Sequence, residues 1–363
     1  MLLANLVTAF RVSPTRYYLP DDPTAALADQ VVEGALAFAI QGKAIALFSI
    51  LFGVGLAIQH ERFSRLGDPR PWLTRRLLAL LAFGLTHLLL IWNGDILVDY
   101  ALGGLLVLPF LGASNRALAR LAAVCLVFYL VFPLLWFAPA WPDVDTLQRE
   151  YLEAMRIYGS GTFAEIRRYS LHEFLVFVPI YVTLFPETPA YLLMGVLAWR
   201  TGLASDPAAH ATLLRRMAMV GVIAGGALSM LSQGRPSELT FASAGLAPLA
   251  MAVGYGAGLL YAMRSPPIHP LLRLFAPAGR MAFTNYIVQS LVFGWIFFGY
   301  GLGLLGRVSA AAALAWGIVA YAAQLALSAW WLRHFRFGPL EWMWRTLTYG
   351  RAQPFRRRPT DAG

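Results

Sequence analysis

Residues 76–112 read RLLALLAFGLTHLLLIWNGDILVDYALGGLLVLPFLG, and this stretch decides the fold class. Two long apolar runs, residues 76–93 and 96–112, are separated only by Gly94 and Asp95. A helix needs about 20 apolar residues to cross about 30 Å of hydrocarbon. Neither run alternates apolar and polar residues every second position, as a β-barrel strand does. The stretch therefore predicts two membrane-crossing helices joined by a short turn.

The same kind of run recurs along the whole chain. Hydrophobic residues make up 58% of the 363 residues and charged residues only 13%, about half the charged share of a soluble domain. We expect an all-α, polytopic transmembrane helix bundle of about nine spans in a single membrane domain, residues 1–363. The predicted spans are 33–58, 76–93, 96–112, 118–138, 173–199, 213–232, 242–263, 281–301 and 309–332.

The basic residues alternate between the connecting segments. Segments 59–75, 113–120, 200–216 and 264–280, together with the tail after residue 332, carry most of the 29 basic residues. By the positive-inside rule this places the C-terminus in the cytoplasm of a bacterial inner membrane. The net charge of +10 is thereby explained by topology, which excludes nucleic acid as the preferred partner. The partner that it predicts is the lipid bilayer.

Three segments fall outside the spans. Residues 1–32 are expected as an outer segment. Residues 139–172 are expected to form two outer interfacial helices, the second starting at a Thr162–Glu165 capping box. Residues 333–363 should form a cytoplasmic interfacial helix from Gly338 and a basic tail. Cys125 is the single cysteine, so no internal disulfide or multi-cysteine zinc site is expected, and no metal site is predicted.

Four stretches carry a resemblance to a known family: KAIALFSILFGVG from Lys43, HLLLIWNGDILVDYA from His87, GRMAFTNYIVQS from Gly279 and FGPLEWMWR from Phe337. In combination they resemble the YeiB-like family of bacterial membrane proteins, which carries the domain of unknown function 418. The resemblance implies a polytopic helical fold in the inner membrane and a distant relation to transmembrane acyltransferases, which take acyl groups from cytosolic acyl-CoA. Family members open with a fuller first span, so residues 1–32 resemble the remnant of a truncated one.

His87 and Asp95 are the candidate catalytic residues. His87 is predicted near the middle of the second span, where an imidazole can accept a proton near neutrality; the alternative is a hydrogen bond that joins two helices. On a straight helix His87 and Asp95 would be about 12 Å apart, too far for a direct pair. We expect His87 to face a polar cavity and to reach an amide such as Asn285 or Gln289, or a substrate.

Other polar residues in apolar surroundings are candidates for binding a substrate. They are Lys43, Asn93, Asp99, Glu187, Asn285, Gln289, Arg75 and Arg76. Lys43 is expected to pair with Asp95 or Asp99, because an unpaired ammonium in hydrocarbon is costly. Pro186 and Pro189 predict a broken helix around Glu187, or a helix that ends at the outer surface. The two amides either line a cavity or join helices.

Three hypotheses for the function remain open. The first is an acyltransferase-like enzyme with His87 as base and with Arg75 and Arg76 near the phosphates of acyl-CoA. Acyl-CoA is the candidate donor substrate, and the sequence identifies no cofactor. The second is a transporter of a small solute or ion through a site near Lys43, Asp95, Asp99 and Glu187. The third is a non-catalytic membrane partner of other proteins. The sequence gives neither the substrate nor the oligomeric state.

Overall fold

The computed structural model describes residues 2–13, 15–16, 19, 26–132, 144–232 and 238–357, and this part of the chain is mostly helical, with an isolated β-bridge between Phe335 and Arg356. Its α-helices run in chain order as α1 (Leu2–Asn5), α2 (Leu27–Ala39), α3 (Lys43–Ser64), α4 (Arg70–Leu90), α5 (Leu97–Val107), α6 (Asn115–Phe132), α7 (Val144–Ser160), α8 (Phe163–Leu184), α9 (Glu187–Arg200), α10 (Ala211–Leu231), α11 (Glu238–Ala262), α12 (His269–Arg280), α13 (Ala282–Phe297), α14 (Ala310–His334) and α15 (Pro339–Tyr349). The predicted all-α, polytopic bundle is confirmed.

Each of the nine predicted apolar runs is mainly helical where it is described, although turns interrupt the first at residues 40–42 and the fifth at residues 185–186. Six helical stretches are long and apolar enough to cross a membrane, namely Leu27–Ser64, Arg70–Leu90, Asn115–Phe132, Ala211–Leu231, Ala242–Ala262 and Ala310–His334. The pair α8 and α9, bent by 44°, makes a seventh if it is one span. The remaining two, Leu97–Phe110 and Ala282–Phe297, are shorter than a full span. Residues 133–143 and 358–363 lie outside the described residues.

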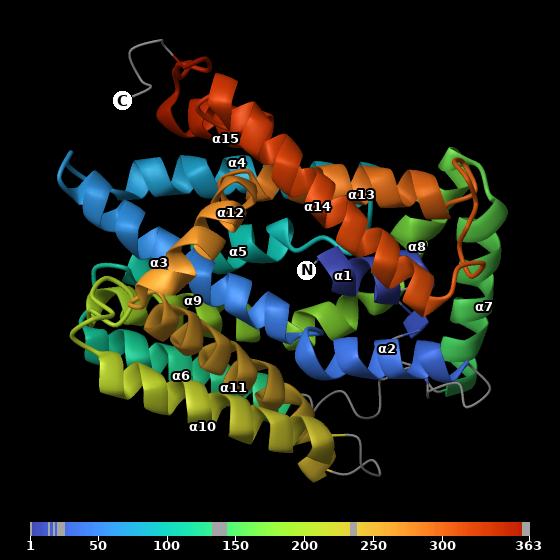
Figure 1. The fold of residues 1–363 in the computed structure, drawn as a ribbon, viewed down its shortest axis with the longest axis horizontal. Coiled ribbons are helices and arrows are strands. Elements are labelled where there is room, and N and C mark those ends of the chain that lie inside the picture. Colours follow the sequence, from blue (N-terminus) through green and yellow to red (C-terminus); the bar gives the residue numbers. More distant parts are fainter. Residues whose placement is uncertain are drawn as a thin grey trace.

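Glycine lets two pairs of helices pack with their backbones in contact. Gly53 of α3 and Gly195 of α9 lie so close to the opposite helix that a Cβ on either would overlap a carbonyl oxygen, that of Leu192 or Ile50. Between α10 and α11, which lie side by side in Figure 1, a Cβ on Gly221 would come 2.7 Å from Gly254 Cα. The small-residue spacing thus serves helix packing, as in membrane bundles generally.

Two expectations about the flanks are refined. Thr162 caps α8 as predicted, with its side chain accepting from the Glu165 amide and the Glu165 side chain bonding back. However, α8 continues without a break to Leu184, so the second outer helix is the start of the spanning helix and not a separate element. Helix α7 crosses one end of the bundle (Figure 1), while α15 begins at Gly338-Pro339 as predicted.

Candidate functional site

The chain leaves the helical path between α4 and α5. The amides of Ile91 and Trp92 both donate to the carbonyl of His87, at 2.9 and 2.8 Å, and this closes the last turn of α4. Residues 91–96 then run without regular helix until α5 begins at Leu97. Within this break Gly94 lies against the indole of Trp92, in a space where a Cβ would overlap the ring. Irregular backbone at this depth is tolerated only where protein surrounds it.

This break brings His87 and Asp95 together. His87 Nδ1 lies 2.7 Å from Asp95 Oδ2, and both side chains are completely buried. The other carboxylate oxygen, Oδ1, accepts the amide of Val98 at 2.7 Å, which fixes Asp95 at the start of α5. The expectation that the two residues are too far apart for a pair was wrong. It assumed a straight helix through residues 91–96, whereas the chain turns back there.

The pair sets the chemistry of the imidazole. A carboxylate at Nδ1 favours the tautomer in which Nδ1 carries the proton, leaving Nε2 with a free lone pair. Nε2 is buried and has no hydrogen-bond partner among the described residues. The ring of Tyr286, from α13, lies 5.0 Å from the imidazole, and the ring of Trp92 stands perpendicular to it at 6.4 Å. A base oriented by a carboxylate and shielded by aromatic rings is the arrangement of a general base.

Two further carboxylates lie near Asp95. Asp99 is close enough to both Asp95 and Glu187 for their charges to repel. Glu187 is the first residue of α9, directly after the break that ends α8, and the hydroxyl of Tyr191 donates to it at 3.5 Å. The broken helix predicted from Pro186 and Pro189 is therefore confirmed. Asp95 of the dyad, Asp99 of α5 and Glu187 of α9 are therefore three neighbouring carboxylates.

Lys43 does not serve these carboxylates. Its side chain is buried, and its ammonium donates to the carbonyl of Ala37 at 2.9 Å. Among the described residues no ion pair within 4.0 Å involves Lys43, so the predicted pair with Asp95 or Asp99 is wrong. The chain turns between α2 and α3 at Gly42, which has a φ of 73°, and this turn presents a carbonyl to the ammonium instead.

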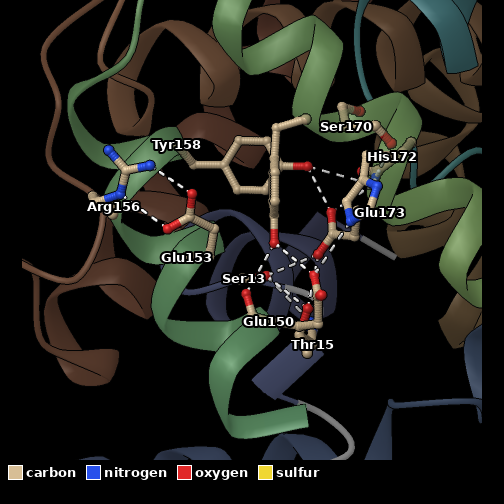
Figure 2. A network of polar contacts seen from close by, with 11 residues as sticks. Ser13, Thr15, Glu150, Glu153, Arg156, Tyr158, Ser170, His172 and Glu173 are labelled. Carbon is tan, nitrogen blue, oxygen red and sulfur yellow. Dashed lines mark hydrogen bonds and ion pairs between the residues drawn. The ribbon is translucent and has the colours of Figure 1, made fainter. Parts of the chain in front are cut away.

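Asn93 connects the break to a second polar cluster, which Figure 2 shows from close by. Its centre is Glu173 of α8, only 2% exposed. The amide of Asn93 donates to Glu173 Oε2 at 2.7 Å, and the hydroxyl of Tyr158 donates to the same oxygen at 2.6 Å. Thr15 and Ser13 donate to Oε1 at 2.7 and 3.3 Å. Four donors therefore hold this carboxylate without a cation.

Tyr158 is part of α7, outside the spanning helices. Burial, and after it the neighbouring Glu173 carboxylate, raises the pKa of Tyr158 well above its ordinary value. The phenol therefore stays protonated; it donates to Glu173 and accepts from Asn93 Nδ2 at 3.4 Å. Sequence reasoning missed this cluster because Glu173 marks the expected start of a span, where a carboxylate is normally wet. The sequence does contain serine, threonine and tyrosine in the flanking segments. These residues are too common to show which of them donates to Glu173.

The amides of α13 join helices. Asn285 Nδ2 donates to Ser328 Oγ at 3.1 Å, and Gln289 Nε2 donates to Gln324 Oε1 at 2.8 Å, both on α14. Of the two alternatives left open by the sequence, these contacts support helix joining. The expectation that His87 reaches Asn285 or Gln289 was wrong, because α13 turns Tyr286 and not its amides toward the imidazole.

The two candidate arginines of α4 lie apart from the dyad. The guanidinium of Arg76 stacks 3.5 Å above the ring of Trp344, and Trp344 Nε1 donates to the carbonyl of Arg76 at 2.7 Å. Arg75 is exposed beside α15. Arg76 thus anchors α15 to α4. A different group of arginines, Arg280, Arg336 and Arg357, lines a cavity of about 380 Å³ together with Phe337.

Comparison with known proteins gives the family. Residues 198–351 match the model of the family described as "Protein of unknown function (DUF418)". The chain is 36% identical over 347 residues to the uncharacterized protein YxaH of Bacillus subtilis, covering 91% of this chain and 85% of that protein. The chain belongs to the DUF418 family.

A second DUF418 relative supports the resemblance found in the motifs. The uncharacterized protein YeiB of Escherichia coli is 29% identical over 336 residues, covering 86% of this chain and 83% of that protein. No solved structure matches the chain. The family is described only as of unknown function and both relatives as uncharacterized, so the chemistry has to be argued from the residues of the site.

Proposed function

We propose that the protein is a membrane-embedded acyltransferase in which His87 is the general base and Asp95 orients it. The observation that carries the proposal is the buried dyad with a free Nε2. If the only role of this histidine were to join two helices, both ring nitrogens would be hydrogen-bonded to protein groups, or one of them would be hydrogen-bonded to water. Here one nitrogen is held by a carboxylate, and the other is buried and has no hydrogen-bond partner in the part of the chain that the structure describes.

The reaction that fits this geometry is transfer of an acyl group from a thioester to a hydroxyl or amine. His87 Nε2 takes the proton of the acceptor as its oxygen or nitrogen attacks the acyl carbonyl carbon. The bond from the acyl carbon to sulfur then breaks, and the leaving thiolate takes the proton from the imidazolium. Asp95 stabilises the imidazolium that exists between these two steps. The atoms balance without a metal or a redox cofactor.

The donor that we propose is acyl-CoA, met from the cytoplasmic side of the inner membrane. The concentration of arginine on alternate connecting segments supports a cytoplasmic C-terminus. The resemblance to transmembrane acyltransferases points to the same donor. The acceptor is an alcohol or amine able to enter the bundle from the other side, and Asn93, Asp99 and Glu187 are the polar groups that it would meet beside the dyad.

The test is release of free CoA thiol from acyl-CoA by the purified protein in proteoliposomes, with a bacterial envelope extract as the source of acceptor. Wild type should release thiol, and His87→Gln should lower the rate by about 100-fold or more, the usual contribution of a general base. His269→Gln is the matched control, because His269 is exposed and bonds only to the carbonyl of Met263. Equal rates for wild type and His87→Gln would refute the assignment.

A proton-coupled transporter is the second candidate, favoured by one observation. Asp95, Asp99 and Glu187 form a chain of neighbouring carboxylates inside the bundle, and such groups mark proton and ion pathways in membrane proteins. The two candidates differ in what the dyad responds to. If His87→Gln and Glu187→Gln abolish pH-gradient-driven uptake of a solute while acyl-CoA releases no thiol, transport replaces acyl transfer as the function.

A further inference from the structure

A cavity of about 380 Å³ opens where the C-terminal tail meets the end of α12. Arg280, Arg336 and Arg357 line it together with Phe337. None of these residues belongs to the dyad, the carboxylate chain or the cluster around Glu173. The cavity is therefore separate from the proposed catalytic site.

Backbone contacts bring the three arginines together from separate segments. Phe335 and Arg356 form an antiparallel bridge, with the amide of Arg336 donating to the carbonyl of Phe355 at 2.9 Å. The amide of Arg357 donates to the carbonyl of His334 at 3.1 Å. Arg280, the last residue of α12, donates from its guanidinium to the carbonyl of Arg336 at 3.4 Å. The tail is thus folded back so that its arginine faces two others.

The three guanidinium groups carry no carboxylate partner. No ion pair within 4.0 Å involves any of them among the described residues. Glu341, five residues after Arg336, accepts from the amide of Thr284 at 2.9 Å and from its hydroxyl at 2.6 Å, so its oxygens are engaged on α13; Asp361 lies outside the described residues. All three residues are exposed, so water and salt weaken the repulsion between their charges, and an anion bound between them would offset it further. The fold holds them together nonetheless.

We propose that this cavity binds a phosphoryl group, presented either by a lipid headgroup or by a soluble phosphate ester such as CoA. Guanidinium forks match the oxygens of a phosphate in a bidentate manner, and a dianion offsets more than one positive charge. The aromatic side chains of the same region, Trp331, Trp342 and Phe355, are of the kind that lies at the level of lipid headgroups. The inference stands without the proposed acyltransferase activity.

If the phosphoryl group belongs to a soluble ester such as CoA, the position of Arg280 links this cavity to the dyad. Arg280 ends α12, and α13 begins two residues later at Ala282. A phosphate held at Arg280 therefore lies next to the start of α13, the helix whose Tyr286 ring lies 5.0 Å from the His87 imidazole. In that case the cavity, and not Arg75 and Arg76, holds the phosphates of the donor.

The test is thermal unfolding of the full-length protein in an uncharged detergent with inorganic pyrophosphate as the probe. Pyrophosphate should raise the unfolding midpoint of the wild type. The triple variant Arg280→Gln/Arg336→Gln/Arg357→Gln should lose this shift. Its apparent affinity for pyrophosphate should be at least tenfold weaker, which is about the effect of one lost charge-assisted contact. The control Arg116→Gln/Arg120→Gln/Arg215→Gln removes the same charge from exposed arginines elsewhere and should retain the full shift. Lysine at the three cavity positions should retain part of it.

Two arms of the experiment identify the source of the phosphoryl group. Stabilisation by CoA that the triple glutamine variant loses assigns a soluble ester. Stabilisation by nanodiscs of phosphatidylglycerol over phosphatidylcholine, lost in the same variant while CoA has no effect, assigns a lipid headgroup. The proposal is overturned if pyrophosphate does not stabilise wild type, or if the triple glutamine variant and its control respond alike. Neither readout depends on acyl transfer, so the two proposals can fail separately.

Discussion

At the residue scale, Glu173 shows how a buried carboxyl group is held by hydrogen bonds inside this bundle. Its two oxygens accept from Asn93, Tyr158, Thr15 and Ser13, so four donors point at one group. Glu173→Gln turns one acceptor into an N–H group that faces donors, and a buried donor left without its acceptor costs about 1–3 kcal/mol. We expect this variant to lower the midpoint of thermal unfolding clearly.

The matched control is Glu153→Gln on α7. Glu153 pairs with Arg156 at the surface, at 2.5 Å, and both side chains are largely exposed. Surface pairs of this kind contribute little because water and salt screen them. The control variant should unfold at the wild-type temperature. Equal midpoints for Glu173→Gln and Glu153→Gln would mean that the buried cluster does not stabilise the fold.

The sequence identified His87 and Asp95 as separate candidates but not as a pair. An imidazole among leucines stands out in any apolar run, and so does an aspartate between two runs. Their distance depends on the path of residues 91–96, which tertiary packing decides and no local pattern reports. The prediction for Lys43 was wrong for the same reason. A buried ammonium needs a partner, as expected, but that partner is the backbone carbonyl of Ala37, next to the turn between α2 and α3, and not a carboxylate.

At the element scale, the contact between α3 and α9 gives a sharp test of helix packing. In Gly53→Ala the new Cβ meets the carbonyl oxygen of Leu192, which is backbone and cannot move aside, so the two helices must separate. Overpacking of this kind costs about 1–3 kcal/mol. Gly55→Ala on the same helix is the control, because nothing lies within 4 Å of its Cβ. We expect thermal unfolding to fall for the first variant only; equal behaviour would exclude close packing at Gly53.

Helices were predictable where their cause is local. The apolar runs gave the spanning elements, Thr162 and Glu165 gave the cap of α8, and Pro186 gave the break before α9. The prediction of two separate interfacial helices in the outer segment was wrong. Helix α8 has enough apolar residues on both sides of Glu173 to continue from the interfacial part into the span. The bends that position the dyad and the tail that closes the arginine cavity come from contacts between distant segments.

At the scale of the whole molecule, the alternation of arginine predicts the orientation in the membrane. A phosphatase fused after residue 363 should be inactive in a bacterial host, since phosphatase requires export, and a fusion after residue 155 should be active. Fusion of a fluorescent protein that folds in the cytoplasm should give the opposite pattern at the same two positions. Activity of the phosphatase at the C-terminus would reverse the orientation and remove acyl-CoA access from the arginine cavity.

The central claim is that His87 and Asp95 act as one catalytic unit, and a double-mutant cycle on the rate of CoA thiol release tests it most directly. Asp95→Asn and His87→Gln should each lower the rate by about 100-fold or more. The rate of the double variant should be within a few-fold of the rate of His87→Gln, because the effects of residues that act as a unit are not additive. A wild-type rate for Asp95→Asn, or losses that multiply in the double variant, would contradict the claim.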